Sequence, residues 1–453
     1  MNVNISKEKT KVKTLTIEER LKNFNEIVKG YDESEAINEA KRCLNCKDPR
    51  CVLGCPAHNN IPMFIKQFIE GDIEGSYNTI QLTSNLSSIC SRVCDQSRQC
   101  EGACIRNKTG EPVAIGLIER YISDYNMAKI SKNAAETQYF DKKVAIVGSG
   151  PAGISCALKL SEYGYNVTIF EANDKIGGLL YNGIPRFRLP NDVLNLKLDE
   201  LKKENIEIKT NSIFGFDFDV RSLKKAGYSA IFIGVGAQAS KYMGIPGEDC
   251  DNLITSSDFL NAVSYGYDVN IGKKVIVVGG GNAAIDAART AIRLNGVENV
   301  KIVYRRTKED MPASISEIED AINEGIELYV LTNPKEIVSK NGEINIICTK
   351  MEQTEVGSDG RRKVKAIENS DFSLNANTLI YAIGNSNDEY IQYVKEIEVD
   401  KYNKIKVDSQ YQQCKDPMIF AGGDVVTGPA TVVEAMVSGI KAANSIHKFL
   451  NKE

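Results

Sequence analysis

The chain has 453 residues, 42% of them hydrophobic and 26% charged, a length and composition typical of a globular protein with two or three domains. Its net charge of −4 lacks the excess of positive charge by which proteins bind nucleic acids or anionic membranes. Residues 1–20 are too polar for a signal peptide, and no apolar run is long enough to span a bilayer. We therefore expect a cytoplasmic protein with neither a nucleic-acid nor a membrane partner.

Cysteine is the most informative residue type. The chain has 12 cysteines, eight of them between Cys43 and Cys104, but only two histidines, His58 and His447. Without a signal peptide, this density indicates metal or cluster ligands rather than disulfides. The scarcity of histidine disfavours imidazole-ligated metals and a histidine acid–base catalyst. Iron–sulfur clusters with cysteine ligands are the leading interpretation.

The first third of the chain is predicted to be helical. Residues 1–30 are expected to form a tail with one short helix, and residues 31–140 a helical block that carries the eight cysteines. Apolar residues at 61–69 and 113–122 have helical spacing. The polar stretch 127–141 is predicted to be a linker.

The cysteines of this block fall into two groups of four. The first group is spaced C-x2-C-x4-C-x3-C and followed by proline, and the second C-x3-C-x5-C-x3-C: Cys43, Cys46, Cys51 and Cys55, then Cys90, Cys94, Cys100 and Cys104. In bacterial ferredoxins the cysteine before such a proline ligates the other cluster. Spacing therefore predicts two tetranuclear clusters with crossed ligation, and two structural zinc sites are the competing interpretation.

A first dinucleotide-binding unit begins at residue 143. A strand at 144–147, a glycine-rich loop, a helix to residue 163 and a strand at 167–170 follow one another, and the loop supplies Gly148, Gly150, Pro151, Ala152 and Gly153. We expect the pyrophosphate of FAD or NAD at the N-terminus of this helix, where free N–H groups favour anions. Glu171, after the second strand, is expected to accept a hydrogen bond from a ribose hydroxyl.

A second unit of the same kind begins at Lys274. Its strands are expected at 275–278 and 300–304, with a loop from Gly279 and a helix to residue 294 between them. After its second strand there is no acidic residue but Arg305 and Arg306. Guanidinium groups at this place can pair with the 2′-phosphate of NADPH. The alternative is that these arginines belong to a solvated loop end.

Three further strands, at 230–235, 379–383 and 419–421, each end in glycine. After the last strand, Gly423 and Asp424 are expected to contact the ribityl chain of a flavin, and a closing helix from about Thr431 to direct its positive end at the flavin ring; an ordinary turn is the alternative. The order of elements predicts an NADP(H)-binding domain, 271–374, inserted between the two parts of an FAD-binding domain, 141–270 and 375–453. The predicted fold class is therefore α/β, with two doubly wound dinucleotide-binding domains preceded by an α-helical iron–sulfur domain.

Taken together, these motifs resemble those of the glutamate synthase small-subunit family, and the resemblance extends over nearly the whole length of the sequence. The same motifs are similar to the large subunit of NADH-dependent ferredoxin:NADP oxidoreductase and to the N-terminal half of dihydropyrimidine dehydrogenase. The resemblance rests on Arg42-Cys43-Leu44-Asn45-Cys46, Gly54-Cys55-Pro56, Arg92-Val93-Cys94, Cys100-Glu101-Gly102-Ala103-Cys104, residues 115–120, the loop 148–153, residues 176–180, Gly183-Ile184-Pro185, Tyr304-Arg305-Arg306 and Ala421-Gly422-Gly423-Asp424.

The resemblance implies a ligand set that spacing alone does not. One 4Fe-4S cluster is implied to use Cys43, Cys46, Cys51 and Cys104, and the other Cys55, Cys94, Cys100 and Glu119, so that Cys90 is not a ligand. The second glycine loop adds Gly279, Gly281, Asn282 and Ala283 to the expected NADP(H) contacts. The resemblance further places the following near FAD or NADPH: Gly178, Leu179, Gly183, Arg188, Gly236 and Gly384.

The expected function is electron transfer from NADPH through FAD and two 4Fe-4S clusters to a larger partner subunit, the glutamate synthase large chain. The flavin carries the chemistry, so no catalytic side chain is expected. Asn2 follows the initiator methionine, so the chain offers no N-terminal cysteine nucleophile for an amidotransferase. An alternative is the large subunit of a flavin-bifurcating enzyme that pairs with a ferredoxin-reductase-like small subunit. A non-catalytic scaffold that keeps its cofactors only for partner binding is a third hypothesis, disfavoured by the intact glycine loops.

Overall fold

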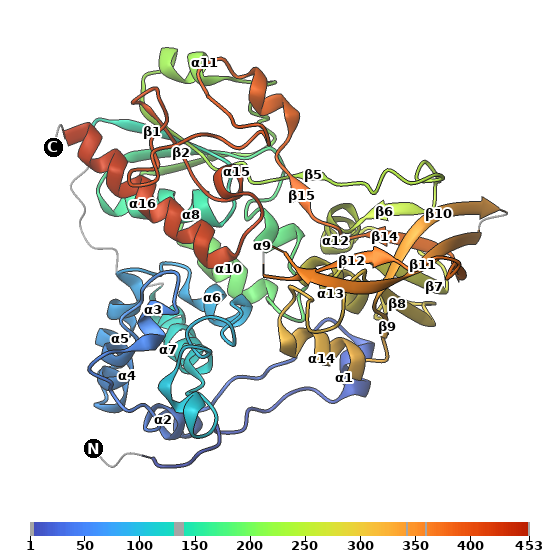
Figure 1. Ribbon diagram of the computed structural model, residues 1–453. Coiled ribbons are helices and arrows are strands. Elements are labelled where there is room, and N and C mark those ends of the chain that lie inside the picture. Colours follow the sequence, from blue (N-terminus) through green and yellow to red (C-terminus); the bar gives the residue numbers. More distant parts are fainter. Residues whose placement is uncertain (1–3, 131–139, 341–342, 358–359, 452–453) are drawn as a thin grey trace.

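The computed structural model describes residues 4–130, 140–340, 343–357 and 360–451, which form three bodies (Figure 1). The first is the helical block, whose short helices pack their apolar faces together around Phe64, Ile80 and Ile118. Its elements are α2 (Glu33–Ala40), α3 (Arg50–Leu53), α4 (Ile61–Ile69), α5 (Ile73–Gln81), α6 (Ser87–Val93), the 3-10 helix η1 (Ile105–Lys108) and α7 (Ile115–Ile130). The predicted helical character is confirmed. The linker predicted from residue 127 is wrong at its start, because α7 continues to Ile130; residues 131–139 lie outside the described residues.

The second body is a parallel five-stranded sheet with the order β16-β4-β1-β2-β3. The helices α8 (Pro151–Glu162) and α16 (Val432–Asn451) cover one face, and α11 (Val220–Lys225) packs on the other. The strands are β1 (Lys143–Val147), β2 (Asn166–Phe170), β3 (Ile206–Lys209), β4 (Tyr228–Ile233) and β16 (Ile419–Ala421), and the smaller helices are α9 (Leu179–Asn182), α10 (Asn191–Asp199), η2 (Glu389–Tyr393) and α15 (Asp424–Thr427). Both faces are covered, which explains why the central strands β1 and β4 are mostly apolar, whereas β3 at the edge alternates apolar and charged residues.

The third body contains a second parallel sheet with the order β6-β14-β7-β8-β9. Its strands are β6 (Leu253–Thr255), β7 (Lys274–Val278), β8 (Asn299–Val303), β9 (Glu327–Tyr329) and β14 (Thr378–Tyr381), and its helices α12 (Ser256–Ser264), α13 (Asn282–Ala291) and α14 (Ile315–Asn323). The insertion of one dinucleotide domain into the other is as predicted, but its boundaries at 270/271 and 374/375 are wrong, since β6 and β14 pair within this sheet. The chain crosses between the bodies at β5 (Ala239–Ser240) and β15 (Asn385–Ser386), which pair with each other.

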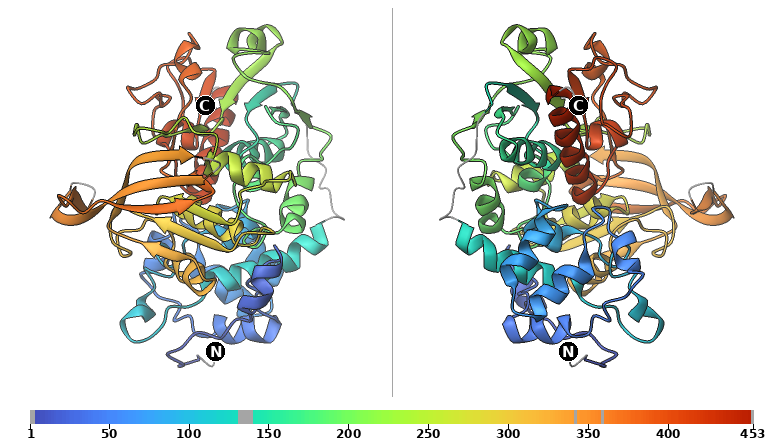
Figure 2. Two further views of the ribbon diagram at one scale, coloured as in Figure 1. Left: turned by 90° about the vertical axis from the view of Figure 1, so that its right-hand side faces the viewer. Right: turned by 90° about the vertical axis from the view of Figure 1, so that its left-hand side faces the viewer.

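An antiparallel sheet extends the third body and was not predicted. It consists of β10 (Thr332–Lys340), β11 (Glu343–Val356), β12 (Arg362–Ala366) and β13 (Phe372–Ala376), and its long hairpin projects from the molecule (Figure 2). Ile337, Ile346 and Leu374 pack against Ile276 and Val303 of the parallel sheet. Buried and accessible residues alternate along much of β11, as in a sheet with only one covered face.

The N-terminal segment is not a free tail. It contains the one short helix predicted, α1 (Ile17–Lys22), and runs from the helical block to α14 of the third body (Figure 1). Arg20 pairs with Asp320 at 2.8 Å, and the Ile27 N–H donates to the carbonyl of Phe187 at 3.1 Å. This segment therefore ties all three bodies together. In the described part of the chain, no helix has the length and apolar character needed to cross a membrane.

Candidate functional site

Two small cavities in the helical block divide the cysteines between them. The first cysteine cavity is walled by Ile61, Ile65 and neighbouring apolar side chains, and its sulfur atoms come from Cys43, Cys46, Cys51 and Cys104. Cys51 lies on α3, whereas Cys104 immediately precedes η1. The donors thus come from both sequence groups, which is the crossed arrangement expected for two clusters.

The second cysteine cavity holds the remaining donors and one acid. Cys55, Cys94, Cys100 and Glu119 line it together with Cys90. Glu119 reaches it from α7, and burial raises the pKa of its carboxyl to about 8. This partition agrees with the ligand set that the family resemblance implies and places Cys90 beside it as a fifth group.

Cysteine residues line the wall of each cavity. Among the described residues, no three His, Cys, Asp or Glu side chains converge closely enough to hold a single metal ion. A tetrahedral zinc with sulfur atoms at 2.3 Å would require them within roughly 3.8 Å of one another. A 4Fe-4S cluster gives each donor its own iron, so its donors stand farther apart. Burial raises the pKa of the Cys51 thiol to about 12, a cost of ionisation that iron ligation would offset.

The first glycine loop has the shape that a pyrophosphate requires. Gly148 has φ +96°, and a Cβ on it would lie 2.5 Å from the carbonyl oxygen of Gly234. A Cβ on Gly153 would lie 1.9 Å from the Gly148 oxygen, so α8 can pack here only without a side chain. Gly150, in contrast, faces open space, with no atom within 4 Å of a Cβ placed on it. The loop is therefore tight at both ends and open in the middle, beside the N-terminus of α8.

The other residues predicted near FAD surround this opening. Gly178 lies against Gly150, with 2.9 Å between its would-be Cβ and the Gly150 Cα, and Leu179 and Gly183 lie in and after α9. Pro151 and Ala152 form the first turn of α8.

Glu171 lies at the end of β2, beside the glycine loop. The backbone N–H and the hydroxyl of Ser149 donate to one carboxylate oxygen at 3.0 and 2.6 Å, and the backbone and side-chain N–H groups of Asn173 donate to the other at 2.9 Å each. An ionised carboxylate has about four lone-pair positions, and these four N–H and O–H donors fill them. A ribose hydroxyl would have to share or replace one of them, so Glu171 also holds the loop in place.

Asp424 begins α15 after the two glycines that follow β16. Its Oδ1 accepts a hydrogen bond from the Ala430 N–H at 3.2 Å, and burial raises the pKa of its carboxyl to about 6. Thr431 caps α16, because its hydroxyl accepts from the Glu434 N–H at 3.3 Å while the Glu434 carboxylate accepts from Thr431. The positive end of the 20-residue helix α16 therefore points toward the same loop as Asp424.

The second glycine loop lies against the end of β8. The ring of Tyr304 lies so close to Gly280 that a Cβ there would be 2.6 Å from a ring carbon, and the Tyr304 hydroxyl donates to the Asp310 carbonyl at 2.9 Å. Arg305 and Arg306 follow Tyr304 directly in the chain. Arg305 is exposed, and the Arg306 Nε donates to the carbonyl of Arg362 at 3.0 Å. The sequence did not predict that strand β12 would hold Arg306 in place through the Arg362 carbonyl.

The other glycines of this loop differ in the space around them: Gly279 is tightly packed against the neighbouring backbone, whereas Gly281 is open. A Cβ on Gly279 would lie 2.2 Å from the Ala382 oxygen, whereas the nearest atom to one on Gly281 is 3.9 Å away. Asn282 accepts from the Ser314 N–H at 3.0 Å, and Ala283 follows it in α13. Gly236 and Gly384, with φ +76° and +101°, lie near the two crossings between the bodies.

Arg188 lies in a network of ion pairs. Its guanidinium is paired with Asp286 at 2.8 Å and with Glu317 at 3.2 Å, so it joins the loop after α9 to helices α13 and α14. The neighbouring Phe187 ring lies 4.2 Å from the guanidinium carbon of Arg293. These pairs place Arg188 at the contact between the two dinucleotide domains, and its contact with a cofactor stays a prediction.

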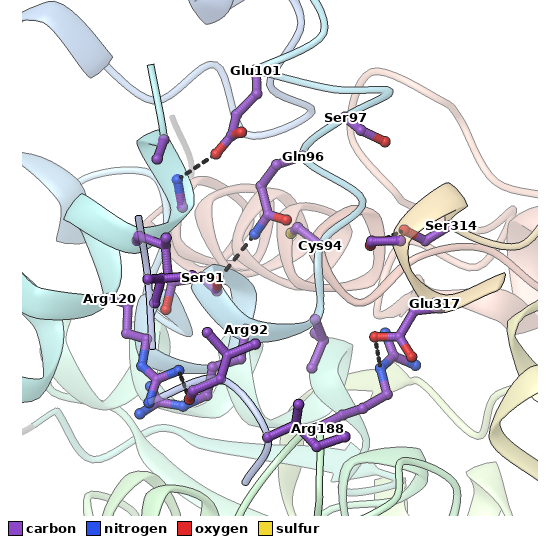
Figure 3. Close-up of a pocket in the computed structure, with 18 of the residues that line it drawn as sticks. Ser91, Arg92, Cys94, Gln96, Ser97, Glu101, Arg120, Arg188, Ser314 and Glu317 are labelled. Carbon is purple, nitrogen blue, oxygen red and sulfur yellow. Dashed lines mark hydrogen bonds and ion pairs between the residues drawn. The ribbon is translucent and has the colours of Figure 1, made fainter. Parts of the chain in front are cut away.

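This contact borders a polar cavity of about 580 Å³ between the N-terminal segment, the helical block and α14 (Figure 3). Figure 3 shows the Arg188–Glu317 pair on one side, Arg92 and Arg120 on the other, and Cys94 between them. Arg92 and Arg120 both pair with Glu26, at 2.9 and 2.8 Å. The charged groups of the wall are thus largely neutralised by one another.

Two glycine loops at the ends of parallel strands, joined to a cysteine-lined helical block, define a pyridine-nucleotide oxidoreductase with an N-terminal iron–sulfur domain. Two family models agree. One described as dihydropyrimidine dehydrogenase domain II, 4Fe-4S cluster, matches residues 20–131, and one described as pyridine nucleotide-disulphide oxidoreductase matches residues 142–439.

Similar proteins with known names show more closely which family the chain belongs to. The glutamate synthase (NADPH) small chain of Escherichia coli K12 is 36% identical over 94% of each chain, and the NADP(+)-dependent formate dehydrogenase subunit beta of Moorella thermoacetica is 36% identical over 89% of this chain and 60% of its own length. The FprA protein of Mycobacterium tuberculosis, solved with NADPH, shares the fold with a TM-score of 0.57 at 18% identity, over 69% of this chain and 85% of its own. The chain belongs to the family of the glutamate synthase (NADPH) small chain.

Proposed function

We propose that this protein oxidises NADPH and delivers the electrons, through one FAD and two 4Fe-4S clusters, to the large chain of a glutamate synthase. The observation that carries the proposal is the division of the eight cysteines and Glu119 between two cavities, beside an open dinucleotide loop. Val433, in the first turn of α16, lines the second cysteine cavity, and the same end of α16 lies next to the Asp424 loop. The proposed flavin and cluster sites therefore share one helix.

The chain's own residues bind and orient the cofactors. Bound FAD supplies the chemistry, because it accepts a hydride from NADPH and releases electrons singly. The free N–H groups of α8 at Gly150 hold the FAD pyrophosphate, and Asp424 accepts a hydrogen bond from the ribityl chain. Arg305 and Arg306 bind the 2′-phosphate of NADPH.

The choice of partner is supported by the extent of the match. The Escherichia coli relative corresponds to this chain almost end to end, whereas the formate dehydrogenase subunit is longer than the region it shares. This match supports a role like that of the small chain, with the substrate chemistry carried out by a partner.

Reconstitution tests this partner. Mixed anaerobically with a glutamate synthase large chain, the protein should support NADPH oxidation that depends on both glutamine and 2-oxoglutarate, the 2-oxo acid that accepts the nitrogen and the electrons, while neither chain does so alone. Failure of the two chains to form a complex, or a rate independent of glutamine, would contradict the proposed partner. NADPH oxidation with a ferredoxin-reductase-like subunit in its place would instead support the bifurcating alternative.

A further inference from the structure

The two dinucleotide domains are joined covalently by a narrow junction. The chain crosses between them at β5 and β15, which are two residues long each and pair with one another. A link this short fixes the relative orientation of two domains only weakly, so the orientation depends on side-chain contacts elsewhere.

A cluster of buried charges joins the two domains on the side of the N-terminal segment. It contains four arginines and four carboxylates: Arg20, Arg188, Arg289 and Arg293, with Asp286, Glu317, Asp320 and Glu324. The four acids and two of the arginines belong to α13, α14 and the turns that follow them. The other two arginines, Arg188 of the FAD-binding domain and Arg20 of α1, supply the positive charge that balances the cluster.

Arg20 connects the N-terminal segment to this charge cluster. Its Nη1 lies 2.8 Å from the Asp320 carboxylate and 3.9 Å from that of Glu324, and its Nε donates to the Leu15 carbonyl at 2.8 Å. The Arg20 side chain is 10% exposed, so salt and water screen these pairs little. Removing one partner of a buried pair leaves an uncompensated charge, which is strongly destabilising for the contact.

The same segment holds the loop after α9 in the FAD-binding domain. The ring centroid of Phe24 lies 6.3 Å from that of Phe187, and the Ile27 N–H donates to the Phe187 carbonyl at 3.1 Å. The Phe187 ring also lies 4.9 and 4.2 Å from the guanidinium carbons of Arg289 and Arg293 in the other domain. Phe187 therefore contacts the N-terminal segment and the NADP(H)-binding domain at once.

We propose that residues 15–28 form a brace that holds the NADP(H)-binding domain against the FAD-binding domain in the orientation in which NADPH gives its hydride to FAD, leaving NADP⁺ and reduced FAD. Arg20 is the positioning residue of this brace. The brace has a fixed base, because Glu26 pairs with Arg92 and Arg120 of the helical block. The inference rests on the proposed function, since it requires FAD and NADPH to meet across the two domains. Their orientation matters because a misplacement of about 1 Å can cost about 100-fold in rate.

The test compares Arg20→Ala, which removes the charge, with Arg20→Lys, which keeps it. Phe24→Ala removes a second contact of the brace without leaving a charge unpaired. Lys22→Ala is the matched control, because Lys22 is an exposed cation of the same helix that pairs with Glu18 at the surface. Hydrogen–deuterium exchange of the full chain and stopped-flow reduction of its FAD by NADPH are measured on each variant.

In Arg20→Ala and Phe24→Ala we expect faster exchange at β5 and β15, because their few hydrogen bonds open when the domains move. Reduction of FAD at saturating NADPH should be slower by about tenfold or more. The NADPH concentration that gives half the maximal rate should change by less than about twofold, since NADPH binds to its own domain in either orientation. Arg20→Lys should recover most of the rate, and Lys22→Ala should retain all of it.

Unchanged exchange and unchanged reduction in both Arg20→Ala and Phe24→Ala would overturn the brace. A higher half-saturating NADPH concentration at an unchanged maximal rate would overturn it too, because it would assign Arg20 to nucleotide binding. If NADPH does not reduce the wild-type protein at all, the proposed function is wrong, and the exchange at β5 and β15 still decides whether the segment braces the domains.

Discussion

Gly150→Ala is expected to fold normally but to lose most of its affinity for FAD. Gly150 has φ −69°, which alanine adopts without strain, and a Cβ here meets no protein atom within 4 Å. It would instead occupy the space through which the pyrophosphate approaches the N-terminus of α8. Overpacking of this kind costs about 1–3 kcal/mol, which corresponds to about a 5- to 150-fold weaker FAD affinity. Flavin release during gel filtration and thermal unfolding of FAD-free protein measure the two effects separately.

The chain contains a matched control in its other glycine loop. Gly281→Ala adds the same methyl group at an open position with φ −88°, and should weaken NADPH binding while FAD is retained. Gly153→Ala should behave differently from both, because its Cβ would collide with the Gly148 carbonyl and lower the stability of the FAD-free protein itself. Full retention of FAD by Gly150→Ala would show that no pyrophosphate lies at this loop.

Replacing Arg305 and Arg306 together by alanine is expected to raise the Michaelis constant for NADPH at least tenfold and to leave that for NADH almost unchanged. Each charge-assisted contact to a phosphate is worth about 1.5–3 kcal/mol, and about 1.4 kcal/mol corresponds to a factor of ten. NADH lacks the 2′-phosphate and so loses nothing. Reduction of ferricyanide by each nicotinamide measures both constants, because this acceptor takes electrons from the flavin without any partner subunit.

Two controls accompany the arginine variant. Lys363→Ala removes a positive charge from the neighbouring strand β12, where Lys363 pairs with Glu355, and should not alter the preference between the nicotinamides. Glu171→Ala should weaken FAD retention without changing that preference, because Glu171 lies in the other dinucleotide domain. Equal loss of activity with NADPH and NADH in the arginine variant would exclude phosphate recognition by these two residues.

The sequence predicted the two glycine loops well because their function requires residues that cannot be replaced freely. Gly148 and Gly153 are each held at distances that exclude a Cβ, and such constraints leave a recognisable motif. The domain boundaries were harder to predict from the sequence. Strand β14 is a short apolar run that would suit either parallel sheet, since both are covered on both faces, and the paired crossing strands β5 and β15 are only two residues long each.

The iron–sulfur ligands show a similar division. Spacing identified the eight cysteines as ligands of two clusters, but it did not reveal that Glu119 shares a cavity with Cys55, Cys90, Cys94 and Cys100, because sequence distance does not show which side chains face the same cavity. The sequence does contain a weak indication of Glu119. This acid lies on the inward face of α7, together with Ile115, Ile118 and Ile122. An acid on an apolar helix face is costly to bury unless it has a partner, which marks it as a candidate ligand.

The most direct test of the whole account is the cofactor content of anaerobically purified wild-type protein. Analysis of flavin, iron and zinc should give one FAD and about eight iron atoms per chain, as two tetranuclear clusters require, with zinc well below one atom per chain. Stoichiometric zinc, or iron near zero after anaerobic reconstitution, would contradict the assignment of the two cysteine cavities to iron–sulfur clusters and with it the proposed path of electrons.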